Sequence, residues 1–238
     1  MVEAPQLTDL FGISFTGAVN AIKGIFEWRS HRRGMLTTNF AEAGGFIRST
    51  PDETRPDLQF HFVIAKLVNH GRSTVFGHGY SCHVCVLRPK SRGSVRLASA
   101  EPLAAPLIDP AFLADADDVQ RLVRGFKLMR GVLQQPALAG YKGRESKASA
   151  GAQSDAEIEQ FVRNHADTVY HPVGSCRMGN GPLDVVDAQL RVRGVEGLRV
   201  VDASIMPSIV SGNTNAPAIM IGEKAAEMIK AGLSSGAA

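Results

Sequence analysis

A mixed fold of helices and an antiparallel sheet is predicted by this sequence of 238 residues. Two runs, residues 58–64 and 80–87, favour β-strands because polar and apolar side chains alternate and β-branched or aromatic residues are frequent. A turn rich in Pro and Gly at residues 89–93 is followed by the short run 94–97, which we expect to return as the hairpin partner of the second strand. The third observation is that segments before and after these runs have the features of helices.

Four segments have the features of helices, and three of them precede the C-terminal region. Apolar residues at spacings of three and four predict an amphipathic helix over residues 15–28, with Gly34 expected to end it. Residues 115–133 begin with acidic and end with basic side chains, as the helix dipole favours. A capping box at Ser154 to Glu157 should open a third helix, after a surface loop at 141–153.

The C-terminal region predicts a buried strand followed by a closing helix. Residues 198–201 form a short apolar run typical of such a strand. The helix should span residues 216–231, with Asn215 as its N-cap and Pro217 in its first turn.

Composition and charge exclude several classes of protein. The formal charge of +3 arises from 26 basic and 23 acidic residues spread along the chain, so we expect no nucleic-acid partner. No apolar run approaches the length of a spanning helix and no signal-peptide pattern opens the chain, which predicts a soluble protein without a transmembrane segment. Three cysteines fit a reducing, cytoplasmic compartment. Cys82 and Cys85 lie three apart in a strand and point to opposite faces, and no metal site is expected.

One histidine and one asparagine are the candidate catalytic residues. His171 lies in a loop bounded by Gly and Pro, away from any periodic apolar face. When an alcohol loses a hydride, a base must take its hydroxyl proton, and histidine suits that task near neutral pH. Asn213 could hold the alcohol oxygen against that base. The competing interpretations are a hydrogen-bonded structural histidine and a turn residue in Ser-Gly-Asn.

Three segments resemble the C-terminal half of the glucose-methanol-choline (GMC) flavoprotein oxidoreductases. They read YHPVGSCRMG at 170–179, LRVVDASIMP at 198–207 and SGNTNAP at 211–217. The resemblance implies that His171 and Asn213 face the flavin and handle the substrate hydroxyl. Because some members carry a second His where this chain has Asn213, His171 is expected to be the sole base.

The same resemblance implies which residues contact the cofactor, FAD. The helix start should place positive charge near the reduced flavin, and the segment after the strand should run along the flavin and its ribityl chain. An ordinary helix cap and an ordinary turn are the alternatives. The expected cofactor-binding residues are Asp202, Ala203, Asn213, Thr214, Asn215, Ala216 and Pro217.

A dinucleotide-binding turn is missing from the sequence. Flavoproteins of this kind hold the pyrophosphate on a G-x-G-x-x-G turn, whereas Gly44-Gly45 and Gly77-His78-Gly79 have the wrong spacing. The chain therefore resembles a GMC protein without its N-terminal FAD-binding half. The resemblance implies an α+β fold, with residues 1–185 as part of an antiparallel-sheet substrate-binding domain and residues 186–238 as the C-terminal strand and helix of a Rossmann-like FAD-binding domain.

The function implied is FAD-dependent oxidation of a primary alcohol to an aldehyde, with hydride transfer to flavin N5 and His171 as the base. Residues 83–93 and 213–217 look most like choline dehydrogenases and medium-chain alcohol dehydrogenases, and the isolated chain is expected to be inactive. Two rivals remain: a hydroxynitrile lyase on the same fold, and a non-enzymatic truncated product or half of a split enzyme. A hydrolase is excluded because Ser175 lacks a G-x-S-x-G context.

Overall fold

The chain folds as two compact units in a computed structural model that describes residues 1–69 and 72–235. The first unit contains Met1–Val86 and Ala116–Ala166, and the second contains Leu87–Asp115 and Asp167–Ala238. Each unit is therefore built from two separate stretches of chain.

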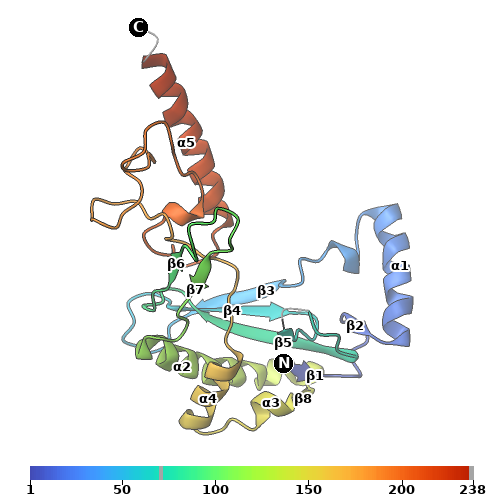
Figure 1. Ribbon diagram of the computed structural model, residues 1–238. Coiled ribbons are helices and arrows are strands. Elements are labelled where there is room, and N and C mark those ends of the chain that lie inside the picture. Colours follow the sequence, from blue (N-terminus) through green and yellow to red (C-terminus); the bar gives the residue numbers. More distant parts are fainter. Residues whose placement is uncertain (70–71, 236–238) are drawn as a thin grey trace. The chain divides into compact units, whose positions relative to one another are not determined.

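The first unit is organised around an antiparallel sheet, visible in Figure 1. Its strands are β1 (Val2–Glu3), β2 (Gly12–Ile13), β3 (Ala43–Ile47), β4 (Leu58–Val63), β5 (Gly77–Val86) and β8 (Arg144–Glu145). The order is β3-β4-β5-β1-β8, and β2 also pairs with β5. The two strands predicted from alternation, β4 and β5, pair along their whole overlap, so the expected antiparallel sheet is confirmed.

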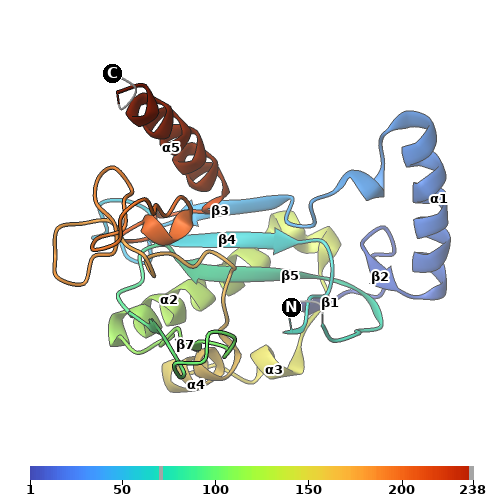
Figure 2. The same ribbon diagram turned by 45° about the horizontal axis from the view of Figure 1, so that its top comes forward.

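The helices of this unit are α1 (Phe15–His31), α2 (Ala116–Leu133), α3 (Lys147–Ala150) and α4 (Asp155–His165), with short 3-10 turns η1 (Met35–Thr37) and η3 (Pro136–Tyr141). Helix α1 contacts η1 and β2, and α2 is the helix that covers the long strands. Helix α2 packs on β4 and β5 with α4 beside it (Figure 2). Both layers contribute fully buried side chains: Leu58 from β4, Val119 and Val123 from α2, and Ile158 from α4. A Cβ at Gly125 would lie 2.8 Å from Val84 Cγ2, so this glycine permits the close approach of α2.

The ends of the helices agree with the sequence-based predictions in some places and differ from them in others. Ser154 and Glu157 form the predicted capping box at the start of α4. Gly34 does not end α1, because Arg32 adopts the left-handed conformation at the C-cap and donates its backbone N–H to the Trp28 carbonyl. The segment 141–153, expected to be a loop, also holds β8 and α3.

A buried ion pair joins the β3–β4 connection to α2. Asp57 is 1% exposed, accepts a hydrogen bond from the Ser49 backbone N–H and pairs with Arg121, which also contacts Glu53 and Asp117. Burial acts to raise the pKa of Asp57, but the hydrogen bonds from Ser49 and Arg121 outweigh it and hold the pKa below its ordinary value.

We expect Asp57→Ala to lower the free energy of unfolding by about 3 kcal/mol, because the Ser49 N–H and part of Arg121 would remain buried without a partner. Since the folded pKa is depressed, the stabilisation is present above the unfolded pKa and is lost as the pH falls through the folded value. Urea unfolding at pH 7 and pH 3 measures both effects. Asp52→Ala, at an exposed carboxylate nearby, is the control; equal stability of the two variants would contradict the assignment.

Helix α1 exposes apolar side chains in this structure. Phe15 is 88% exposed and Phe26 is 67% exposed, and both belong to the apolar stripe predicted from sequence. We expect the 238-residue chain to self-associate at micromolar concentrations, and Phe15→Ser with Phe26→Ser to reduce it. Light scattering coupled to gel filtration measures this. A monodisperse wild-type monomer would contradict the expectation.

The second unit holds a two-stranded ribbon of β6 (Ser94–Arg96) and β7 (Leu107–Asp109), the 3-10 turn η4 (Ala203–Ile205) and helix α5 (Asn215–Ser235). The predicted hairpin between residues 80–87 and 94–97 is wrong, because β6 pairs with β7. The Ser91 hydroxyl accepts the Asp115 N–H, which fastens the turn before β6 within the second unit. The sequence signal for β7 was too short to identify this partner.

The strand predicted at residues 198–201 is also wrong. Leu198 is half exposed, and the only ladder contact recorded in this stretch of the described chain is an isolated bridge between Arg191 and Arg199. The backbone bonds instead close a local loop, in which Val192 N–H donates to the Leu198 carbonyl and Val200 N–H to the Leu190 carbonyl. An apolar run forms a strand only where a neighbouring strand supplies its hydrogen bonds.

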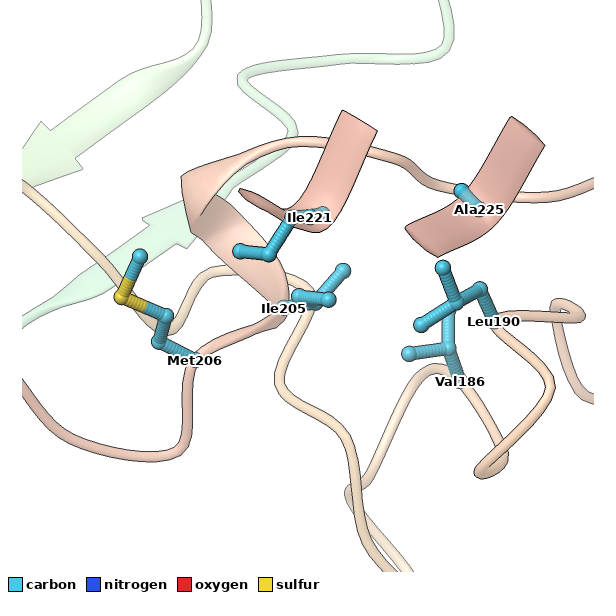
Figure 3. Close-up of a cluster of buried hydrophobic side chains, with 6 residues drawn as sticks. All are labelled: Val186, Leu190, Ile205, Met206, Ile221 and Ala225. Carbon is cyan, nitrogen blue, oxygen red and sulfur yellow. The ribbon is translucent and has the colours of Figure 1, made fainter. Parts of the chain in front are cut away.

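A small apolar core holds η4 against α5 (Figure 3). Its buried members are Val186, Leu190, Ile205, Met206, Ile221 and Ala225. Ile205 and Met206 come from the end of η4, and Ile221 and Ala225 come from α5. This core fixes the two segments from which most candidate site residues project.

Candidate active site

Every site residue predicted from sequence lies in the second unit. The loop that carries His171 is bound by its backbone to η4: Gly174 and Cys176 N–H groups both donate to the Ser204 carbonyl at 3.1 Å, and Met178 N–H donates to the Ile205 carbonyl at 2.8 Å. The loop is thus held on the segment that the apolar core anchors.

His171 contacts the residue that precedes α5. Its Nδ1 lies 3.0 Å from the Thr214 hydroxyl oxygen and 3.4 Å from the Thr214 backbone nitrogen. Thr214 is buried, and His171 is half-buried. The structure therefore brings the histidine loop next to the 211–217 segment, forty-three residues later in the chain.

The backbone is strained beside both candidate catalytic residues. Tyr170, which precedes His171, has φ 66°, and Ser211, two residues before Asn213, has φ 64°. Non-glycine residues in this left-handed region cost about 1–2 kcal/mol, and such residues cluster at functional sites. The Ser211 hydroxyl accepts a hydrogen bond from Arg88 at 3.3 Å, which helps to hold this turn.

The start of α5 differs from the prediction by one residue. The helix begins at Asn215, so Thr214 rather than Asn215 occupies the N-cap position, and its carbonyl accepts the Ala218 N–H at 2.9 Å. Pro217 lies in the first turn, as expected, and has no N–H. The N–H groups of Asn215 and Ala216 precede the first intrahelical bond and lie at the positive end of the helix dipole.

Asp202 caps the 3-10 turn. Its carboxylate accepts the Ser204 N–H at 2.7 Å, while the side chain stays exposed and Ala203 is half-buried. The geometry gives Asp202 a definite turn-forming role. Contact with a cofactor stays a prediction for both residues.

Two polar groups remain available for a ligand. Asn213 is exposed, and no side-chain hydrogen bond of Asn213 occurs among the described residues. Within the same part of the chain, the Nε2 atom of His171 likewise has no recorded partner, because both contacts of the ring are at Nδ1. An imidazole nitrogen and a carboxamide from neighbouring segments are the groups that acid-base chemistry and oxygen binding require.

Other titratable groups fit catalysis less well. Burial raises the pKa of both Cys82 and Cys85 to about 11, so these residues stay as thiols and lack the reactivity of a thiolate at neutral pH.

Residues 1–69 and 72–235 contain no group of three or more His, Cys, Asp or Glu side chains arranged to hold a metal ion. Among the helices formed by those residues, none is long and apolar enough to cross a membrane.

The sequence of most of the second unit, together with α2, α3 and α4 of the first, matches a known family. Residues 89–222, which include every residue of the candidate site, match the model of the GMC oxidoreductase C-terminal region. The chain belongs to the GMC oxidoreductase family. Members of this family are FAD-dependent flavoproteins, and the resemblance stated from the three motifs is confirmed.

Curated relatives within the GMC family are alcohol and choline dehydrogenases. The chain is 48% identical over 218 residues to an alcohol dehydrogenase [acceptor] of Pseudomonas putida, covering 92% of this chain and 40% of that protein. It is 47% identical over 204 residues to an oxygen-dependent choline dehydrogenase of Klebsiella pneumoniae, covering 86% of this chain and 37% of that protein. The chain thus spans about 40% of the length of the relatives it matches.

A solved GMC-type structure has the same fold over most of the chain. Pyridoxine 4-oxidase from Mesorbium loti superimposes with a TM-score of 0.71 at 33% identity, covering 79% of this chain and 37% of that one. The mixed architecture of helices and antiparallel sheet is therefore that of the family.

Sequence reasoning missed the contact between Thr214 and His171. It assigned Thr214 only to the cofactor-binding set, because nothing in a linear motif indicates that its hydroxyl faces an imidazole forty-three residues away. The one available signal was a threonine hydroxyl beside the predicted helix start, three residues before Pro217.

Proposed function

We propose that the chain is the catalytic C-terminal part of an FAD-dependent enzyme that oxidises a primary alcohol to an aldehyde. The observation that carries the proposal is the fixed junction between the His171 loop and the segment 213–215 at the start of α5, in a GMC chain 48% identical to an alcohol dehydrogenase. Within this proposal, residues 1–185 are part of the substrate-binding domain and residues 186–238 complete the FAD-binding domain.

The residues present suit the flavin end of FAD. The Asn215 and Ala216 N–H groups and the positive end of α5 favour negative charge, which develops on a flavin ring as it is reduced. The other proposed contacts are Asp202 and Ala203, at the start of η4, and Asn213, Thr214 and Pro217, at or just before the start of α5. When bound, FAD would supply a hydride acceptor at N5.

His171 would act as the base. Its Nε2 has no partner among the described residues and would take the proton of the substrate hydroxyl as the hydride leaves the carbinol carbon. The alcohol would lose one proton and one hydride, which is a two-electron oxidation, and become the aldehyde. The backbone bonds to Ser204 hold the loop that presents this ring and offset the strain at Tyr170.

Asn213 would orient the alcohol oxygen. Its exposed carboxamide lies one residue from Thr214, which contacts the imidazole, so substrate oxygen and base are held by adjoining parts of the backbone. When the alcohol oxygen is held in this orientation on binding, its orientational entropy is lost before the chemical step, and the barrier of that step is lower.

The isolated 238-residue chain is expected to bind FAD weakly or not at all. The reason is that the contacts proposed above concern only the flavin end of FAD, and the sequence has no G-x-G-x-x-G turn to hold the pyrophosphate. Isothermal titration with FAD, and absorbance after gel filtration, measure this. A yellow protein that retains one FAD per chain would contradict the expectation.

The proposed activity is tested in the chain joined to an N-terminal FAD-binding half. Purified holoenzyme should reduce an artificial electron acceptor when supplied with a primary alcohol, and a series from choline to medium-chain alkanols ranks the substrates by kcat/KM. Failure with every primary alcohol, at full FAD occupancy, would reject the proposal. Release of cyanide from a hydroxynitrile without reduction of the acceptor would indicate a lyase instead.

A further inference from the structure

We propose that α1 and the residues at its C-terminal end form a docking face for a lipid bilayer with anionic headgroups. The docking face consists of an apolar stripe, Phe15, Val19, Ile22 and Phe26, and of four basic residues, Lys23, Arg29, Arg32 and Arg33. Lipid binding would be independent of the proposed alcohol oxidation, because none of these residues belongs to the candidate active site.

One side of α1 is fastened to the first unit. Ser14 caps the start of the helix, and its hydroxyl oxygen lies 2.6 Å from Nε2 of the buried His78. Asn20 donates from its side chain to a backbone carbonyl of the segment before β2 at 3.0 Å. Gly24 is buried, and a Cβ there would lie 2.8 Å from Met35 Cγ. The helix is therefore held by its cap and by the side that carries Asn20 and Gly24.

The apolar stripe lies on the opposite side of α1. Its members are spaced by four, three and four residues, so they form one face of the helix. At 3.6 residues per turn this face points roughly 180° away from the buried Gly24. Ile22 is 56% exposed, and Phe15 and Phe26 are more exposed still. Figure 1 and Figure 2 both show α1 beyond the end of the sheet, away from α2.

Exposed apolar surface continues past the start of α1. Ile13 of β2 and Phe76 form an isolated bridge there, and both side chains are exposed. A row of exposed aromatic and branched side chains of this kind marks a surface that contacts another apolar phase.

The charge beside the stripe indicates what that phase is. Residues 15–33 carry four basic side chains and one acidic side chain, so their net charge equals the +3 of the whole chain. The four basic side chains are exposed, and the Arg32 guanidinium lies 4.5 Å from the centre of the Trp28 ring. The acidic side chain, Glu27, packs against Gly34 in the segment that follows the helix. An apolar helix face flanked by arginine and lysine is the arrangement that binds in the interface of an anionic bilayer.

A second copy of α1 would match this charge less well. Two helices related by a two-fold axis pair with like ends together or with each basic end against the first turn of the partner. The first pairing brings two basic segments together. The second supplies no negative charge, because the first turn of α1 has no acidic side chain and is the positive end of the helix dipole. An anionic bilayer supplies both the apolar phase and the negative charge.

The test measures sedimentation with lipid vesicles. The 238-residue chain and the completed holoenzyme are each mixed with vesicles of phosphatidylcholine alone, or of phosphatidylcholine with phosphatidylglycerol. We expect both proteins to bind the anionic vesicles at least about 10-fold more tightly than the neutral ones, and the binding to weaken as salt is added.

Two double variants separate the apolar and the basic parts of the docking face. Phe15→Ser with Phe26→Ser removes apolar contact, and Arg29→Glu with Arg33→Glu reverses charge while Arg32 keeps its place at the C-cap. Each should weaken binding to anionic vesicles by about 10-fold or more. The replaced side chains are exposed, so the circular dichroism spectrum and the alcohol oxidation of the holoenzyme should not change.

The matched control is Arg55→Glu with Lys142→Glu, which makes the same change of charge at exposed positions elsewhere in the first unit. This variant should bind vesicles as the wild type does; a loss equal to that of Arg29→Glu with Arg33→Glu would mean that only net charge matters and would overturn the proposal.

Three further results would overturn it. The first is no binding of the wild type to anionic vesicles. The second is binding by the 238-residue chain but not by the holoenzyme, which would make the N-terminal half the partner of the stripe. The third is self-association that requires Phe15 and Phe26 in a holoenzyme that ignores vesicles, which would make the partner a second copy.

Discussion

Replacement of His171 by alanine is expected to slow reduction of the flavin by alcohol roughly 10²-fold or more, the usual effect of losing a positioned acid-base group. The ring contacts the rest of the site through Thr214, and its free Nε2 is the group proposed to take the hydroxyl proton. Stopped-flow reduction of the holoenzyme under anaerobic conditions measures the rate directly.

The controls for His171→Ala separate catalysis from folding and cofactor binding. FAD content should hardly change, because the loop keeps its backbone bonds to Ser204 and Ile205. His31→Ala removes an exposed imidazole at the end of α1 and should leave the rate unchanged. An unaltered reduction rate in His171→Ala would make His171 a structural residue.

Asn213→Ala is expected to lower the flavin reduction rate by about 10-fold or more, because the alcohol oxygen would no longer be held against the base. The pKa that governs the reduction rate should not change, since a carboxamide does not titrate. Asn213→His should instead add a titrating group and reshape the pH profile. Stopped-flow reduction measured from pH 6 to pH 10 follows both variants.

A normal reduction rate in Asn213→Ala would leave this residue as a turn former. The site would then reduce to His171 and the N-terminus of α5. Asn180→Ala, at an exposed carboxamide elsewhere in the second unit, is the matched control for loss of an amide.

Local signals in the sequence were enough for several elements of the fold. Alternation located β4 and β5, and the capping box at Ser154 located the start of α4, because each of these depends on residues close together in the chain. Pairing between strands from distant segments could not be predicted from such local signals. Residues 94–96 pair with 107–109, and residues 198–201 form no strand, because in each case the result depends on which backbone lies alongside.

In the candidate site, too, local motifs were predicted correctly and a contact between distant residues was not. The motifs around His171 and Asn213 identified the family and both segments of the site. They did not reveal that Thr214, rather than Asn215, holds the N-cap position of α5 or that its hydroxyl lies against the imidazole. The contact requires a fold that brings the loop at 170–179 beside the start of α5, which linear spacing does not encode.

The most direct test of the proposed function is an anaerobic single turnover. The holoenzyme that contains this chain is mixed with excess primary alcohol, and flavin absorbance and aldehyde are measured together. We expect the oxidised flavin spectrum to bleach fully and one aldehyde to form for each flavin. A flavin that stays oxidised with every primary alcohol tested, in a protein with full FAD occupancy, would contradict it.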